Sequence, residues 1–251
     1  MAVPFKFYLT HIANRSGYRA NWEPNRPLEL GMIGTLRNGV FDIQTSLEQQ
    51  GIISKVLKDL TPGELDYTSH ESVNIATKLG GQAPILGSVL TETEAGFVID
   101  FKSENSVVFK ITDTLTHQIV NAAEWEKQVL AKFKDGSWKK EWFIITQLVE
   151  AVSATIIVNN SNDNRLELKA STGIGQSGIK LADVSLGLTV AKEKGSSLKV
   201  IAQKGITPLY RAMGIRHPLF GKPELSSKGD TAEIKEEKFR IQEFDAGEIK
   251  E

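Results

Sequence analysis

The longest uninterrupted β-type run in the chain constrains its fold more than any other feature. Residues 142–158 read Trp-Phe-Ile-Ile-Thr-Gln-Leu-Val-Glu-Ala-Val-Ser-Ala-Thr-Ile-Ile-Val and end at an Asn/Asp/Ser turn. β-Branched and apolar residues bounded by turn formers predict a strand, here about three times the ordinary strand length. Such a strand fits either a strongly curved antiparallel sheet or an assembly larger than one chain, such as a membrane barrel.

Alternation of apolar and polar residues predicts further strands. The apolar members of four such strands are Phe5, Phe7 and Leu9; Phe97, Ile99 and Phe101; Val107, Phe109 and Ile111; and Val184, Leu186, Leu188 and Val190. Two more strands are predicted around residues 165–170 and 198–202, and Asn38-Gly39 predicts a hairpin turn after residue 37.

Two segments carry helix signals. Ser46 begins a capping-box pattern, and apolar residues at helical spacing follow from Ile53 to Leu60, before Pro62. The stronger helix starts at Asn121 and has Trp125, Val129 and Phe133 on one face. We therefore predict an α+β protein: one domain with a twisted, mainly antiparallel sheet of long amphipathic strands, few helices, and a short C-terminal tail.

Composition excludes several classes of function. The 251 residues contain no cysteine, which rules out disulfides, thiolate metal sites and cysteine nucleophiles. The 30 Lys and Arg nearly balance the 31 Asp and Glu, so whole-chain charge gives no reason to expect a nucleic-acid partner. Residues 217–251 carry nine acidic and six basic side chains and form a charge-rich tail. Without a signal sequence or a long apolar run, we expect a cytoplasmic protein.

The sequence offers little catalytic chemistry. The four histidines are scattered without a metal-ligand spacing, and the glycine run at 173–178 lacks the strand-to-helix context of a dinucleotide loop. We expect no cofactor and no metal. An enzyme built from dispersed residues such as His70, Glu150 and Asp183 remains one hypothesis, and a soluble module that binds a lipid or a protein in a sheet cavity is another.

Basic residues suggest a cationic surface. The simpler interpretation is a solvated polar face. The functional interpretation is a surface for anionic lipid headgroups, near which each Lys or Arg contributes about 1 kcal/mol to binding. The candidate lipid-binding residues are Lys6, Arg15, Arg19, Lys127, Lys132, Lys134, Lys139 and Lys140.

The order of segments resembles the gasdermin family of membrane pore-formers, in its bacterial and fungal forms. The start of the 142–158 run is similar to the strand that opens the second half of that family's pore-forming domain. Residues 198–215, Leu-Lys-Val-Ile-Ala-Gln-Lys-Gly-Ile-Thr-Pro-Leu-Tyr-Arg-Ala-Met-Gly-Ile, are similar to its closing segment. Near the N-terminus, Arg26-Pro-Leu-Glu-Leu, Gly39-Val-Phe and Ser46-Leu follow the same order.

The resemblance implies a pore-forming domain at 1–216 and an autoinhibitory tail at 217–251, which would dock through Phe239, Ile241 and Phe244. It implies a latent cell-death effector without enzyme activity, which a protease or a partner variant activates. The protein would then leave the cytoplasm for the anionic inner face of the plasma membrane and form a homo-oligomeric β-barrel. The alternating residues at 97–101, 107–111 and 184–190 would insert. Two departures are the missing N-terminal cysteine, which bacterial members often lipidate, and the missing large C-terminal inhibitory domain.

Overall fold

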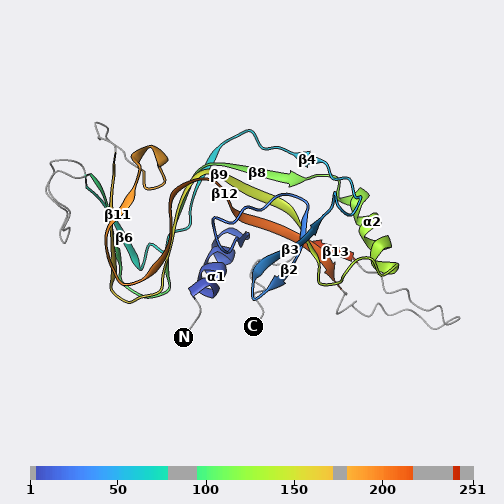
Figure 1. Cartoon of the computed structure of the whole chain (residues 1–251), viewed down its shortest axis with the longest axis horizontal. Helices are drawn as coiled ribbons and strands as arrows, with labels where there is room; N and C mark the ends of the chain where they lie inside the picture. The colour runs from blue at the N-terminus through green and yellow to red at the C-terminus, as the bar shows by residue number, and fades with distance from the viewer. Residues whose placement is uncertain (1–3, 79–94, 172–179, 217–239, 244–251) are drawn as a thin grey trace, which may run out of the picture.

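The computed structural model describes residues 4–78, 95–171, 180–216 and 240–243. Within these ranges the chain forms two helices, one 3₁₀ turn and thirteen strands, most of them short (Figure 1). In chain order the elements are α1 (Pro4–Ser16), β1 (Arg19–Ala20), β2 (Met32–Arg37), β3 (Val40–Ser46), β4 (Val56–Leu57), β5 (Gly63–Asp66), β6 (Val73–Lys78), β7 (Gly96–Phe101), β8 (Ser106–Ile119), α2 (Ala122–Lys134), β9 (Phe143–Asn159), β10 (Asn164–Lys169), η1 (Val184–Leu186), β11 (Thr189–Lys194), β12 (Ser197–Arg216) and β13 (Arg240–Glu243).

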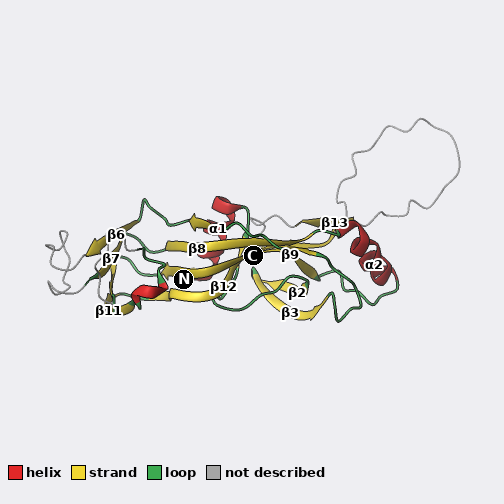
Figure 2. Ribbon diagram, turned by 90° about the horizontal axis from the view of Figure 1, so that it is seen from above, coloured by secondary structure: helices red, strands yellow, loops and turns green. Residues whose placement is uncertain are grey.

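The strands form a long sheet and a short sheet, and every described pair is antiparallel. In the long sheet β9 lies at the centre, with β12 along one edge and β8 and β2 sharing the other. β3 pairs with β2, β4 and β5 pair with the outer edge of β8, and β1 and β13 pair with the outer edge of β12. The short sheet has the order β11-β10-β7-β6. Figure 2 shows β8, β9 and β12 running side by side toward it.

Each helix covers a different part of the long sheet. α1 lies beneath the middle of the long strands in Figure 1, where Tyr8 and Ile12 pack with Phe109, Ile156 and Leu209 in one buried cluster. α2 lies at the end far from the short sheet, and its buried Trp125 and Val129 belong to a second cluster. Burial of these apolar side chains is what holds the helices to the sheet.

A segment at 180–188, which we call the cover segment, packs between the two sheets on the other face of β9. The hydroxyls of Ser153 and Thr155 donate hydrogen bonds to the carbonyls of Ala182 and Leu181. The cover segment also contributes leucines to a third cluster, which joins the sheets; its members are Val73, Phe97, Ile99, Phe101, Val108, Ile157, Leu166, Leu168, Leu181, Leu186 and Leu188. Near the short sheet, both faces of β9 are therefore covered.

Several predictions from the sequence are confirmed. The protein is α+β with mostly antiparallel sheets, and the 142–158 run is one strand, β9. The strands at 97–101 and 107–111 are β7 and the first half of β8. Asn38 and Gly39 have φ values of 52° and 81° in the turn between β2 and β3, and the helix predicted from Asn121 is α2.

The predicted N-terminal strand is wrong, because residues 4–16 form α1. Tyr8, Leu9, Ile12 and Ala13 are all buried, and this spacing belongs to one face of a helix. Apolar and polar residues do alternate over residues 5–9, but five residues are too few to distinguish a strand from one face of a helix. Pro4 at the first helical position fits the missing N–H there.

The predicted short helix after Ser46 is also wrong. Ser46 Oγ accepts a hydrogen bond from the Gln49 N–H, but the turn ends at Gly51, whose φ is +71°. The chain then runs along the edge of β8 as β4. Ile53 and Leu60, expected on a buried helical face, are 76% and 85% exposed.

The predicted strand at 184–190 is wrong over residues 184–188. Asp183 Oδ1 accepts from the Ser185 N–H and starts η1, and Gly187 adopts a left-handed φ of 55° that ends it. β11 begins only at Thr189. Leu186 and Leu188 are buried in the cover segment, whereas Val190 is exposed on β11.

We predict that Ile12→Ala lowers the free energy of unfolding by about 2–5 kcal/mol, because it leaves a cavity between α1 and the sheet. Asn14→Ala, on the exposed side of the same helix, should change it by less than about 0.5 kcal/mol. Urea unfolding followed by circular dichroism measures both. Equal effects of the two substitutions would show that α1 is not held by this core.

Candidate functional site at the bend between the sheets

The central ladder keeps its register through the bend. In the long sheet Ser106 pairs with Asn159, and in the short sheet Phe101 pairs with Asn164. Phe101 and Ser106 are five positions apart, and so are Asn159 and Asn164. The β7–β8 chain and the β9–β10 chain are therefore one long two-stranded ladder, bent where each chain has four unpaired residues, and straightening it requires no register slip.

The outer strands do not match in this way. Ser197 pairs with Asn159 in the long sheet, and Lys194 pairs with Arg165 in the short sheet. Between these two pairs, the β9–β10 chain advances six positions, from Asn159 to Arg165, whereas the β11–β12 chain advances three, from Lys194 to Ser197. The difference of three residues means that β11 and β12 cannot follow a straight ladder without moving relative to β10.

Buried amides hold the bend together. The side-chain amide of Asn159 donates to the carbonyls of Ser103 and Ser161, at 2.9 and 2.7 Å, and its Oδ1 accepts from the amide of Asn164 at 2.8 Å. Asn159 and Asn164 are both almost fully buried. Ser196 joins the same network, because its N–H donates to Ser161 Oγ. All three turns of the bend are thereby connected through side chains.

Residues with a left-handed backbone conformation change the direction of the chain near the end of each turn. Asn105 and Asp163, with φ values of 57° and 51°, come immediately before β8 and β10. Gly195 has a φ of 103°, and a Cβ there would lie 2.7 Å from the side chain of Asn164. Glycine is required at that position both for its conformation and for space.

A cavity of about 840 Å³ lies on the inner side of the bend. β5 and β8 supply one wall, β6 and β7 the other, and residues 180–182 close one side. The buried side chains of Val73, Phe97 and Leu181 line it with apolar surface. A cavity of this size and lining is within the range of small-molecule sites.

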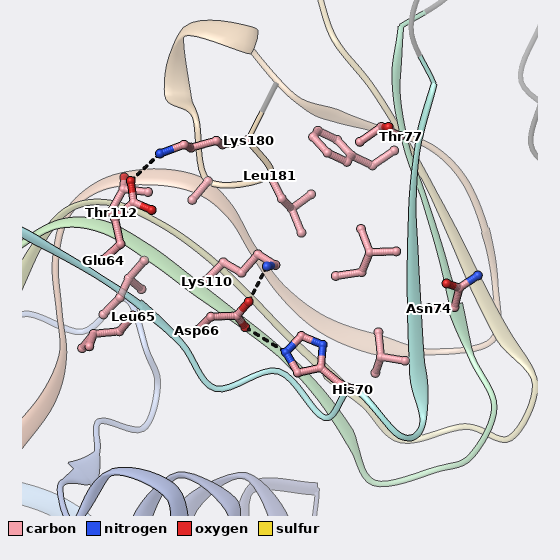
Figure 3. A pocket seen from close by; sticks show the side chains of 15 residues that line it. Glu64, Leu65, Asp66, His70, Asn74, Thr77, Lys110, Thr112, Lys180 and Leu181 are labelled. Atoms are coloured by element: carbon pink, nitrogen blue, oxygen red, sulfur yellow. Dashed lines mark hydrogen bonds and ion pairs between the residues drawn. The ribbon is translucent and has the colours of Figure 1, made fainter. Parts of the chain in front are cut away.

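Charged side chains lie at the mouth and on one wall of this cavity. Figure 3 shows Lys110 reaching between Asp66 and Leu181, with His70 on the other side of Asp66. Lys110 Nζ donates to Asp66 Oδ2, and His70 Nε2 lies 3.7 Å from Asp66 Oδ1. Lys180 and Glu64 form a second, more exposed ion pair at the rim.

The electrostatics of Asp66 favour its charged form. Partial burial acts to raise its pKa, but hydrogen bonds from Lys110 and Thr68 outweigh burial and hold the pKa below its ordinary value. The carboxylate therefore stays ionised and keeps the Lys110 ammonium in place beside the apolar lining.

The structure brings the residues predicted to insert into membranes together around the bend, but it covers them. Phe97, Ile99 and Phe101 face the cover segment, whereas Val107, Phe109 and Ile111 lie in the cluster under α1. All six are buried. In this conformation none of them is available to lipid.

The basic residues form two groups rather than one surface. Lys6 and Arg15 lie on α1, while the five candidate lysines at 127–140 lie on α2 and the turn after it, at the end of the molecule. Lys127, Lys134, Lys139 and Lys140 are exposed and Lys132 is half-exposed. Arg19 is 5% exposed in β1, so it offers no surface in this state.

Part of the acidic tail adds a strand to the long sheet. β13 pairs with the last residues of β12, and Ile241 lies opposite Ile215. Phe239 and Phe244, the other two residues expected to dock the tail, fall outside the described residues, as does 217–238 as a whole.

The three residues named for an enzyme have separate partners. His70 pairs with Asp66, Glu150 lies 3.5 Å from His117, and Asp183 caps η1. Among the described residues, no three His, Asp or Glu side chains are grouped to hold a metal ion. No helix in the same part of the chain is long and apolar enough to span a bilayer.

Sequence reasoning identified 159–164 and 103–105 only as turns. It missed that the two connections, residues 102–105 and 160–163, are equal in length, which is the one signal from which the matched register could have been found. Asp66 and Lys110, which share the cavity wall, are 44 positions apart, and nothing in their local pattern marks them. Comparison with known proteins adds no identification, because neither a protein-family model nor a curated protein matches the chain.

We predict that Asn159→Ala lowers the free energy of unfolding by about 1–3 kcal/mol more than Asn160→Ala, because it leaves the partners of its buried amide in two turns unsatisfied. Asn160 is the exposed neighbour and serves as the control. Urea unfolding of the two variants provides the measurement. Similar midpoints would mean that the amide network does not stabilise the bend.

The lowered pKa of Asp66 predicts a pH dependence. The unfolded chain takes up this proton first as pH falls, so the stabilisation is present above the ordinary Asp pKa and is lost as pH falls through the folded-state value. Asp66→Asn should therefore reduce the acid-induced loss of stability between neutral pH and pH about 3. Thermal unfolding across that range tests it, and an unchanged pH profile in the variant would contradict the assignment.

Proposed function

We propose that the chain is a latent pore-forming protein, which binds an anionic membrane, oligomerises, and straightens the bent ladder into long β-hairpins of a β-barrel. The matched register at the bend is the observation that carries this proposal. Straightening would join β7 to β8 and β9 to β10 without re-pairing any residue. The resulting strands exceed the 9–11 residues that cross a bilayer.

The two faces of the short sheet support the same function. On β10, Leu166 and Leu168 face the cover segment, while Arg165 and Glu167 lie on the other face. Arg165 also contacts Asp100 of β7, at 3.1 Å. An apolar face toward lipid and a polar face toward a water-filled lumen is the pattern of barrel strands.

The strand edges provide a route to assembly and to its control. Within the described residues, β12 pairs on its outer edge with β1 at Leu209–Tyr210 and with β13 at Met213–Arg216, and the stretch 197–206 pairs only with β9. An open edge is a template for another chain. Removal of β13 would open a second part of this edge, at 213–216, which gives the tail an inhibitory role.

The lysines at the α2 end support binding to an anionic surface. They lie away from the bend, so they can contact headgroups while the short sheet and its cover rearrange. Binding of this kind should weaken as salt rises.

Dye release from anionic liposomes tests the proposal. A specific protease site inserted between Ser227 and Lys228 lets the tail be cut in the folded chain. We predict little release by the uncut protein and strong release after cutting, matched by a chain that ends at Arg216. No release under either condition, from protein that remains folded, would refute pore formation.

A reversible cross-link tests the movement itself, because the chain has no native cysteine. Glu64→Cys with Lys180→Cys ties the cover segment to β5, and a short bis-thiosulfonate reagent can join them. We predict that this lock abolishes dye release by the cut protein and that reductant restores it. The control pair, Lys55→Cys with Glu124→Cys, joins another ion pair away from the bend. Release by the locked protein at the control's rate would show that the cover segment does not move.

The cavity favours one alternative, a lipid- or protein-binding module without pore activity. A co-purifying ligand together with inactivity on liposomes after tail cutting would support it. The liposome dye-release assay therefore distinguishes the two functions, because only a pore-forming protein releases dye after the tail is cut.

A further inference from the structure

The cavity on the inner side of the bend has an excess of hydrogen-bond donors. Asp66 already accepts from the Thr68 N–H and from Lys110, and His70 lies at its other side. Lys110 Nζ has three N–H groups, and among the described residues only Asp66 is its partner. The remaining Lys110 donors face the cavity without acceptors from the described part of the chain, and the His70 ring, with Nε2 3.7 Å from Asp66 Oδ1, lines the same cavity.

Apolar surface continues from these donors into the cavity. Phe97, Leu181 and Val73 are buried and lie on its lining. Figure 3 shows Leu181 and Thr77 across the open space from Asp66 and His70. A ligand that satisfies both parts needs an anionic oxygen at one end and an aliphatic chain at the other.

We propose that this cavity binds a single-chain amphiphile with a carboxylate or phosphate head group. The head group accepts hydrogen bonds from Lys110 and His70, with Lys180 at the rim. The chain lies against Val73, Phe97 and Leu181.

Occupancy would also affect the bend. The walls of the cavity come from both sheets, so a ligand that spans them binds the bent form and not a straightened one. A ligand that prefers one conformation shifts the population toward it. This consequence rests on the proposed function, whereas the binding itself does not.

Displacement of a fluorescent fatty-acid analogue from the full-length chain, in the absence of vesicles, tests the site. Laurate and dodecyl phosphate are the competitors, and dodecyltrimethylammonium has the same chain with the opposite charge. We expect the two anions to displace the probe and the cation to fail. No probe binding at all, or equal displacement by the cation, would overturn the proposal.

Variants locate the binding. Lys110→Met keeps the length of the side chain, removes its charge, and should weaken laurate binding by about tenfold or more. Thr77→Trp fills the cavity from β6 and should also abolish binding. Lys55→Met removes an ion-paired lysine outside the cavity and serves as the control. Urea midpoints verify that each variant is folded, and wild-type affinity in both folded cavity variants would overturn the assignment.

The same displacement assay with lipid vesicles as competitor identifies the source of the ligand. Displacement by laurate but not by phosphatidylglycerol vesicles identifies a free amphiphile, and displacement by vesicles with the same Lys110 dependence identifies a bilayer lipid. Both results support the site. Because binding is measured without permeabilisation, a chain that binds laurate and never releases dye would refute the proposed pore while leaving the cavity intact.

Discussion

Backbone pairing of β9 with its neighbours is the constraint on which the rest of the structure depends. β9 pairs with β12 along one edge and with β8 and β2 along the other, so its position fixes both sheets. Since β8 and β9 continue into β7 and β10 in unchanged register, the short sheet is an extension of this ladder turned through a bend. The turns, the amide network and the cavity all follow from that geometry.

The ladder stays bent because other parts of the protein cover the apolar face of the short sheet. The apolar face of the short sheet is buried against Val108, Ile157 and the leucines of the cover segment, and leaving it exposed to water would cost roughly 25 cal/mol per Å². A lipid environment removes that cost. The choice between the bent and the straight form then depends on what covers one apolar face, and Asn159 and Asn164 stabilise the bent form in water.

The sequence predicted the elements whose pattern is long or strongly periodic, and missed those decided by a few residues. The run that became β9 and the Trp125 helix were identifiable because burial repeats along each of them. Residues 5–9 show strand alternation within a helix, and only the later burial of Ile12 and Ala13 distinguishes the two. One capping aspartate and one left-handed glycine replace the first residues of a predicted strand with η1, Val184–Leu186. The cavity could not be predicted, because its walls come from four strands and a loop that only the fold brings together.

The most direct test of the central claim is a distance across the bend, measured between spin labels on Glu150 of β9 and Lys169 of β10, both exposed. Without native cysteines, two introduced ones are labelled uniquely. After tail cutting in the presence of anionic vesicles, we predict that this distance lengthens toward the value for an extended strand, about 3.3 Å per residue. A distance unchanged between the soluble and the membrane-bound protein would contradict the claim that the ladder straightens.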